Sequence, residues 1–444
     1  MYSRAAMQSD ELRNPVIVIP GILGSKLAQS GTGRIVWGAF TPTVADPATA
    51  DGAQLIALPM QIGSELRELT DDVVATGALD TIQVQLFGIP FQQRAYQQIL
   101  GALGVGGYRD QQLSEAGAID YGDMHFTCFQ FAYDWRRDLV ENAAQLETFI
   151  RERKRLVESE LRERFGIERD VKFDIVAHSM GGLVARYLLR YGSQDLPLDG
   201  SLPKPTWAGK QLIGRLLLVG TPNAGSPDAV RQLVDGFQPA PLLPNYSQAI
   251  LGTMPAIYQL LPRDRHGPLV SAADPTQRIE RLFDVKFWEE ARWGLADPAR
   301  DADLQRLLPG VVDAAERRRI ALDHLAKCLE RARRFHAAMD APLVPPTGRE
   351  ADLFAGDAME TVAVLAVDPA TGRLTNHSYA PGDVTVSRAS ALLDERVGGT
   401  WSPSLNSPIA WDRVQFLFRD HLGLTTDPSF TDNVLYSLLE DPTR

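Results

Sequence analysis

The chain has 444 residues and a formal net charge of −11, with 44% hydrophobic and 23% charged residues. The length permits two or three domains, and the composition is ordinary for a soluble globular protein. The acidic balance argues against a nucleic-acid partner, because a phosphate polymer repels an acidic surface. It leaves room for a local basic face that touches a membrane surface transiently.

Cysteine usage limits the covalent and metal chemistry. Cys128 and Cys328 are the only cysteines, too few for a disulfide framework or a structural zinc site. We expect two unpaired core thiols, and a single bridge between them is the alternative. No motif calls for a metal or another cofactor.

The sequence has no segment typical of membrane insertion. The first 15 residues contain no apolar run that could serve as a signal peptide. No stretch approaches the roughly 20 apolar residues of a transmembrane helix. We therefore expect a cytoplasmic protein without a transmembrane segment, while export by a leaderless route stays open.

Four short apolar runs predict strands, at residues 16–19, 173–177, 216–219 and 361–367. They are rich in Val, Ile and Leu with little polar alternation, as are strands of a parallel sheet that helices cover on both faces. Helical patterns at 141–165 and 182–191 lie between them. This alternation predicts an α/β fold with a mostly parallel central sheet.

The middle of the chain predicts an insertion. Residues 223–346 combine Pro-rich pieces with charged helical patterns and show no convincing strand. Because sheet-like chain resumes afterwards, we predict a largely helical cap or lid inserted into a core of residues 1–222 and 347–444. A second, irregular insertion is expected at about 31–83.

One segment of the cap, residues 311–339, has apolar residues at roughly helical spacing and arginines at other positions. We interpret it as a helix packed on the core with solvated arginines. The alternative is a lid whose basic face meets anionic lipid.

The strongest motif is the run Phe-Asp-Ile-Val-Ala-His-Ser-Met-Gly-Gly at 173–182. It predicts a buried strand, a tight turn at Ser179 and a helix, the arrangement that exposes a nucleophilic hydroxyl above a sheet. Strand and helix then pass very close, which requires small residues at Ala177 and Gly181. The helix amides point toward the serine, so the N–H of Met180 can donate to an oxyanion. A serine that merely caps a helix is the alternative.

A second oxyanion donor is expected after the first strand. The strand at 16–19 runs into the loop Pro-Gly-Ile-Leu-Gly-Ser at 20–25, and glycines let a backbone approach a ligand closely. We predict the N–H of Ile22 as the donor, with Leu23 as the next candidate. An ordinary strand-to-loop turn is the alternative.

The base should be a histidine late in the chain, because the order in this fold is Ser, then Asp or Glu, then His. Four of the histidines after Ser179 lie in the cap or ahead of the best acid candidate. His421 alone follows a late apolar run and precedes a loop. We therefore predict His421 as the base and reject His266, His324, His336 and His377.

The best acid candidate is Asp383, which follows Pro-Gly and precedes a β-branched run. A carboxylate on such a turn beside a strand can accept the Nδ1 proton of the base and hold its tautomer. Asp357 and Asp368 are rivals, since turns often carry Asp for local hydrogen bonds. The predicted triad is Ser179, Asp383 and His421.

Five motifs in one order resemble the lecithin:cholesterol acyltransferase family, which also includes lysosomal phospholipases and phospholipid:diacylglycerol acyltransferases. They reach from about residue 15 to 425. The motifs are Pro20-Gly21-Ile22-Leu23-Gly24-Ser25, Tyr133-Asp134-Trp135-Arg136, Ala177-His178-Ser179-Met180-Gly181-Gly182, Gly220-Thr221-Pro222-Asn223-Ala224-Gly225-Ser226 and Gly382-Asp383-Val384-Thr385-Val386.

The resemblance implies an α/β-hydrolase fold with a cap and an acyl-enzyme formed from a lipid ester. It implies Ser179 as nucleophile, Asp383 as acid and His421 as base, and oxyanion amides at Ile22 and Met180. These implied roles agree with the roles inferred from the residues. It also implies that the Tyr-Asp-Trp-Arg stretch packs near the catalytic centre.

Within that stretch, we expect Asp134, Trp135 and Arg136 to be structural, with an ion pair between the acid and the arginine. The chain departs from the family pattern at two places: Ala132 stands where the family has Pro, and Val384 where it has a second Gly. The leader and disulfides of the secreted members are not evident here. That argues against cholesterol as the acceptor.

The sequence thus predicts a serine hydrolase that cleaves a lipid ester, of the lipase or phospholipase A kind. Two alternatives within enzymes are an acyltransferase that uses an alcohol acceptor and an esterase that acts on small soluble esters. Outside enzymes, the alternative is a hydrolase-like scaffold for protein binding. The expected partner is a lipid or another ester substrate.

Overall fold

The structure is a computed structural model that describes residues 13–40, 44–78, 81–86, 89–94, 96–239, 243–346 and 348–441. Residues 1–12 lie outside these ranges, so the expectation that the N-terminus carries no signal peptide and the cytoplasmic location both stay predictions. Among the described helices, none is both long and apolar enough to cross a membrane.

The centre of the fold is a parallel sheet, in the order β15-β12-β10-β9-β1-β8 over the described residues. Every neighbouring pair in it is parallel. The strands are β1 (Val16–Ile19), β8 (Cys128–Gln130), β9 (Phe173–His178), β10 (Ile213–Val219), β12 (Ala351–Gly356) and β15 (Trp411–Leu417). Three of the four predicted strands are among them, and the predicted α/β class is confirmed.

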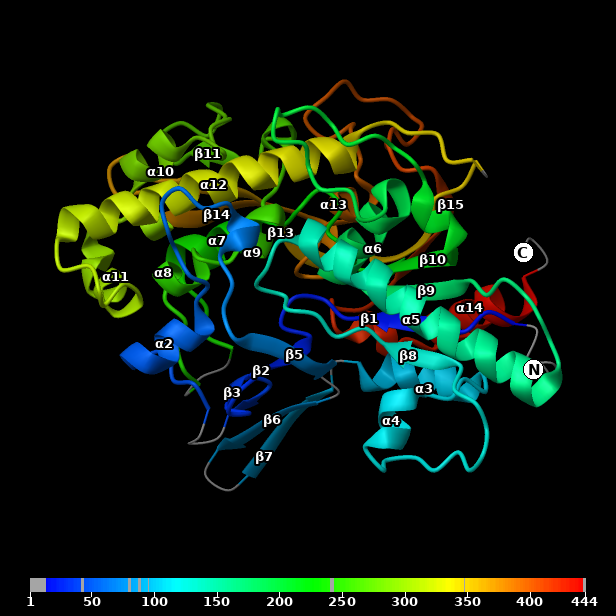
Figure 1. Cartoon of the computed structure of the whole chain (residues 1–444). Helices are drawn as coiled ribbons and strands as arrows, with labels where there is room; N and C mark the ends of the chain where they lie inside the picture. Colours follow the sequence, from blue (N-terminus) through cyan, green and yellow to red (C-terminus); the bar gives the residue numbers. More distant parts are fainter. Residues whose placement is uncertain are drawn as a thin grey trace.

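Helices cover both faces of this sheet (Figure 1). Val16 and Val18 of β1 pack in a cluster with α3 (Gln97–Val105) and α14 (Pro428–Leu435). The alternate residues Ile17 and Ile19 pack in the main core with α5 (Leu139–Phe165) and α6 (Met180–Tyr191). Successive side chains of a strand point to opposite faces, so uniformly apolar strands require a helix layer on each side.

The predicted strand at 361–367 was assigned to the wrong sheet. It forms β13 (Met359–Val367), which pairs antiparallel with β14 (Leu374–Gly382) and parallel with β11 (Leu269–Ser271). Several residues of β13 are only partly buried, as in a sheet with one open face. The place in the central sheet belongs to β12, all six residues of which are buried.

The prediction that residues 223–346 contain no strand was also wrong, since β11 lies there. Its three residues, Leu-Val-Ser, are too few to form a sequence pattern. Apart from β11, the described part of this segment consists of helices and irregular chain, and the domain boundaries stay a prediction. Both cysteines are free and buried, as expected.

Smaller elements surround this core. The segment expected to be irregular, at about 31–83, contains short strands and a helix, with β5 paired to β2 just before the segment. The remaining strands and α-helices are β2 (Ser25–Gln29), β3 (Ile35–Trp37), β4 (Ala39–Phe40), α2 (Ala50–Ile56), β5 (Val73–Ala78), β6 (Thr81–Leu86), β7 (Ile89–Arg94), α4 (Gln111–Glu115), α7 (Pro227–Asp235), α8 (Gln248–Leu251), α9 (Pro255–Gln259), α10 (Val285–Ala291), α11 (Asp301–Leu307), α12 (Ala314–Asp340) and α13 (Arg388–Leu392).

The long helix α12 crosses the upper part of Figure 1 and packs on the core through its apolar residues. Five of its arginines pair with carboxylates, which favours a packed helix over a basic, lipid-facing lid. These pairs are Arg317 with Asp301, Arg318 with Glu289, Arg319 with Glu316, Arg331 with Asp138 and Asp195, and Arg333 with Glu330.

A buried charge cluster fixes the last turn of α12 to α6. Arg190 donates to the carbonyl oxygens of Met339 (2.9 Å) and Ala341 (3.0 Å). Glu350 accepts from Arg190 Nε at 2.7 Å and from Arg186 Nε at 3.2 Å, and all three side chains are fully buried. Burial alone would raise the pKa of Glu350, but the two arginines outweigh it and hold the pKa below its usual 4.5.

Glu350→Gln should lower the free energy of unfolding by about 3 kcal/mol, because it leaves two buried guanidinium groups without their anion. Urea unfolding at pH 7 measures this. The loss should shrink as the pH falls below 4.5. A carboxylate with a depressed pKa adds stability above its unfolded pKa and loses it as the pH falls through the folded pKa.

Glu330→Gln is the matched control, since Glu330 pairs with Arg333 on the surface, where both side chains are at least half exposed. It should change the unfolding free energy by less than about 1 kcal/mol. Equal effects of the two substitutions would contradict the importance of the buried cluster.

Candidate active site

Ser179 occupies a strained turn between β9 and α6. Its backbone has φ +53° and ψ −129°, a region that residues other than glycine rarely adopt. The Ser179 N–H donates to Val219 O (2.8 Å), and its carbonyl accepts from Gly182 N (3.0 Å). The turn therefore presents the hydroxyl at the carboxyl edge of the sheet, as predicted.

The small residues around the turn are required by close contact. A Cβ on Gly181 would lie 2.4 Å from the carbonyl oxygen of Pro20. A Cβ on Gly21 would lie 2.7 Å from the Cβ of Ser179. The loop after β1 thus touches the serine turn directly, and any larger side chain would push the two apart.

The structure brings the three predicted triad residues together. His421 Nε2 lies 2.9 Å from Ser179 Oγ, and His421 Nδ1 lies 2.8 Å from Asp383 Oδ2. The hydroxyl can donate to Nε2 when the ring is neutral and carries its proton on Nδ1. Only 13% of the His421 side chain and 1% of Asp383 are exposed.

The loop after β14 fixes the orientation of the Asp383 side chain. Its Oδ1 accepts from the backbone N–H groups of Val386 (2.6 Å) and Thr385 (3.1 Å), which leaves Oδ2 for the histidine. The N–H of His421 also donates to the Asp383 carbonyl, at 2.8 Å. The rivals Asp357 and Asp368 follow β12 and β13 and take no part in this contact.

Four aromatic side chains hold the polar backbone groups of the loop at 20–25. They leave the N–H of Ile22 without a hydrogen bond to the described part of the chain. The N–H of Met180, at the first position of α6, is likewise unused there. The four contacts are Tyr133 Oη to Pro20 O (2.8 Å), Gly21 N to Tyr96 Oη (2.7 Å), Trp37 Nε1 to Leu23 O (2.8 Å) and Trp135 Nε1 to Ser25 O (3.3 Å).

The expected ion pair between Asp134 and Arg136 is present. Arg136 Nε and Nη2 donate to the two carboxylate oxygens of Asp134 at 3.0 and 2.7 Å. Nη2 also reaches Asp71 (2.7 Å), and Nη1 binds the carbonyl of Ile56 at the end of α2 (3.0 Å). Arg136 therefore ties the chain after β8 to the insertion after β3, a structural role.

The motif after β10 contacts both the loop that carries Asp383 and the ring of His421. Ser226 Oγ donates to Thr385 O at 2.7 Å and also accepts from Asp228 N at the start of α7. Gly220 has φ +58°, and a Cβ there would lie 3.1 Å from the His421 ring. This motif is one of the five that carry the family resemblance, but the sequence analysis predicted no role for its residues.

Sequence reasoning missed Tyr96 and gave no role to His178. Tyr96 belongs to no motif, so no local signal marks it. His178 lies within the serine motif, directly before Ser179, but the sequence analysis predicted no role for its side chain. Both are buried beside Ser179.

The histidines rejected as bases lie elsewhere. His324 and His336 are buried in α12, where their Nε2 atoms contact the carbonyl oxygens of Thr253 (3.0 Å) and Gln259 (2.8 Å). His266 contacts Glu395, and His377 lies on β14. Among the described residues, no group of His, Cys, Asp and Glu side chains could hold a metal ion.

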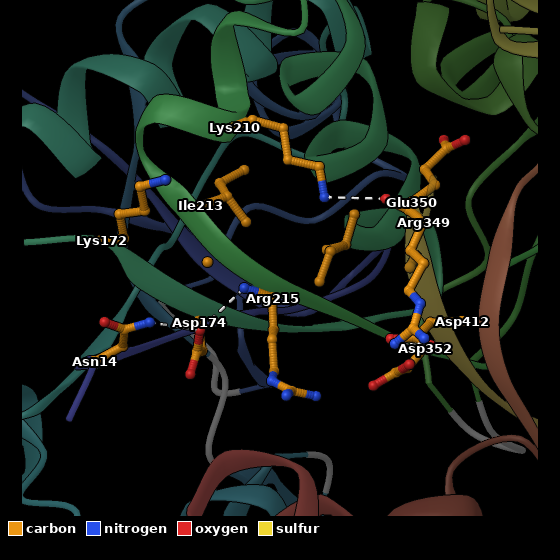
Figure 2. A pocket seen from close by; sticks show the side chains of 13 residues that line it. Asn14, Lys172, Asp174, Lys210, Ile213, Arg215, Arg349, Glu350, Asp352 and Asp412 are labelled. Atoms are coloured by element: carbon orange, nitrogen blue, oxygen red, sulfur yellow. Dashed lines mark hydrogen bonds and ion pairs between the residues drawn. The ribbon is translucent and has the colours of Figure 1, made fainter. Parts of the chain in front are cut away.

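A large pocket of about 630 Å³ lies at the opposite, amino edge of the central sheet (Figure 2). Charged side chains of both signs line it, among them Lys172, Lys210, Asp352 and Asp412. Its position at the starts of β9, β10, β12 and β15 separates it from Ser179 by the length of the strands. It is therefore not the site of the serine chemistry.

A model of the lecithin:cholesterol acyltransferase family matches residues 117–281. This stretch contains the Tyr-Asp-Trp-Arg motif, the serine turn and the motif after β10, and it confirms the resemblance over these residues. The comparison with curated protein sequences found no significant match.

Comparison with solved structures supports the fold. A chain of the Tle4–Tli4 complex is 16% identical, with a TM-score of 0.59 over 96% of this chain and 98% of that one. More distant are Bacillus licheniformis lipase BlEst2 (12% identity, 98% and 94% covered, TM-score 0.32) and lipase 1 from Pelosinus fermentans (12%, 97% and 99%, 0.33). Together with the helix-covered parallel sheet, the first similarity confirms the predicted α/β-hydrolase fold.

Gly181→Ala should destabilise the protein by about 1–3 kcal/mol, because the new methyl group overpacks the contact with Pro20 O. Gly101→Ala is the control. Gly101 lies within α3 with open space around it, so alanine should stabilise by about 0.5–1 kcal/mol. Chemical denaturation measures both, and a neutral Gly181→Ala would contradict the close approach of loop and helix.

Proposed function

We propose that the protein is a serine hydrolase that cleaves a lipid ester, as a lipase or phospholipase A does, through an acyl-enzyme on Ser179. The observation that carries the proposal is the hydrogen-bonded chain from Ser179 through His421 to Asp383. The family match supports an enzyme that acts on lipid esters. Transient contact with a lipid surface is part of this proposal.

In the proposed mechanism, His421 Nε2 takes the hydroxyl proton as Ser179 Oγ attacks the ester carbonyl carbon. The Asp383 carboxylate stabilises the imidazolium that forms. The amides of Ile22 and Met180 bind the oxyanion, each contributing about 3–4 kcal/mol. The leaving alcohol takes the proton from His421, and an acyl-enzyme remains.

Water, activated by the same histidine, then attacks the acyl-enzyme and releases a fatty acid. Transfer to an alcohol acceptor is the second candidate, which the name of the matching family favours. Both reactions share the acyl-enzyme and differ only in the attacking hydroxyl. Added glycerol would divert acyl groups into a new ester if the site accepts alcohols.

Ser179→Ala should lower fatty-acid release from phospholipid vesicles at least about 10³-fold, because it removes the nucleophile and leaves the packing almost unchanged. Hydrolysis of a short p-nitrophenyl ester should fall equally. Release of fatty acid is measured by titration and by mass spectrometry of the products.

Ser159→Ala is the control, since Ser159 is a partly buried serine of α5 whose hydroxyl donates to Glu163 and takes no part in the triad, and its rates should equal those of the wild type. Unchanged release by Ser179→Ala would refute the nucleophile. Serine-dependent activity on the short ester alone would keep the catalytic site and remove the lipid as substrate.

A further inference from the structure

Two buried side chains, Tyr96 and His178, form a hydrogen-bonded chain beside Ser179. The N–H of Gly21 donates to Tyr96 Oη at 2.7 Å. Tyr96 Oη lies 3.2 Å from His178 Nδ1, and His178 Nε2 lies 3.2 Å from the carbonyl oxygen of His421. Only 3% of Tyr96 and 2% of His178 are exposed.

One arrangement of protons satisfies every contact. Tyr96 Oη accepts from Gly21, so its own proton is available to His178 Nδ1. The neutral ring then carries its proton on Nε2 and donates to the His421 carbonyl. Burial, together with the nearby His421, lowers the pKa of His178 to about 3, so the ring keeps this neutral form at physiological pH.

The chain connects the two loops that supply the proposed oxyanion donor and the base. Gly21 precedes Ile22 and packs against Ser179. At the other end, the His421 backbone is held on both sides, by His178 at its carbonyl and by Asp383 at its N–H. His178, which directly precedes Ser179 in the chain, therefore anchors His421, the proposed base.

The packing around the chain leaves little room for adjustment. The Tyr96 ring meets the His178 ring edge-on at 5.5 Å, and the His178 ring lies 4.9 Å from the His421 ring. On the other side, a Cβ on Gly24 would lie 2.7 Å from Tyr96 Oη. A hydroxyl lost here cannot be replaced by a neighbouring side chain without movement of the loop.

We propose that Tyr96 and His178 are positioning residues, which set the Ile22 amide and the His421 imidazole at their working distances from Ser179. This inference rests on the proposed function. Neither side chain touches the substrate. Their loss should slow the chemical step and leave substrate binding unchanged, since small displacements of reacting groups have large effects on rate.

Tyr96→Phe removes the hydroxyl and keeps the ring. It should lower kcat on a short p-nitrophenyl ester about 10- to 100-fold, with KM unchanged and with the folded fraction equal to that of the wild type. The rate of covalent labelling of Ser179 by a fluorophosphonate should fall by a similar factor. Labelling needs the same base and oxyanion donors but no lipid.

His178→Gln and His178→Leu form a matched pair. A glutamine amide can still donate to the His421 carbonyl, whereas leucine has similar size and no donor. We expect the glutamine variant to label faster than the leucine variant by about 10-fold, although both stay folded. Equal labelling rates for the two variants would overturn the positioning role of His178.

Tyr191→Phe is the control for Tyr96→Phe. Tyr191 is equally buried and donates to Ala338 O at 2.7 Å, at the far end of α6. It should keep wild-type kcat and labelling rates. The inference would be overturned if Tyr96→Phe were labelled at the wild-type rate. It would also be overturned if unfolding accounted for the loss of activity in this variant, or if only KM changed. Failure of the wild type to release fatty acid, with normal labelling, would instead count against the lipid substrate.

Discussion

The strained turn at Ser179 is the constraint on which the site depends. The backbone enters from a strand buried on both faces and leaves as a helix, with φ +53° at the serine. Such strain persists only where the surroundings hold it, and here they do so by contact. Gly181 packs against Pro20 and Gly21 packs against Ser179, so the proposed nucleophile and the loop with the proposed oxyanion donor form one unit.

The buried backbone groups of the loop at 20–25 need hydrogen-bond partners, which explains why so many aromatic side chains surround it. Apart from the bond from Gly24 N to Gly21 O, its polar backbone groups need partners outside the loop, and a buried unpaired N–H or C=O is unfavourable. Tyrosine and tryptophan side chains complete these hydrogen bonds while also excluding water. Within the described ranges the N–H of Ile22 has no partner, and Gly21 beside it packs against Ser179; this is why we propose the Ile22 amide as a preorganised donor.

Local patterns in the sequence predicted much of this site. The strand, small residues and helix around Ser179 lie within a few residues of one another, and chain order selected His421 and Asp383. The structure brings these three side chains together from β9, the loop after β14 and the loop after β15. The local motif around Ser179 and the order of acid and base along the chain were sufficient to select these three residues.

Contacts between distant segments could not be predicted in the same way. The run at 361–367 is as β-branched as the central strands, and only its partners decide that it pairs with β14. The residues of β11 are too few for a pattern. Tyr96 reaches Gly21 and His178 across 75 and 82 residues, so its importance depends entirely on tertiary packing.

The most direct test of the account is a crystal structure of the protein after reaction with a lipid-like alkyl fluorophosphonate. The account predicts a covalent bond from Ser179 Oγ to phosphorus, with the phosphoryl oxygen about 2.7–3.1 Å from the amide nitrogens of Ile22 and Met180. An adduct on another residue, or a phosphoryl oxygen turned away from both amides, would contradict it.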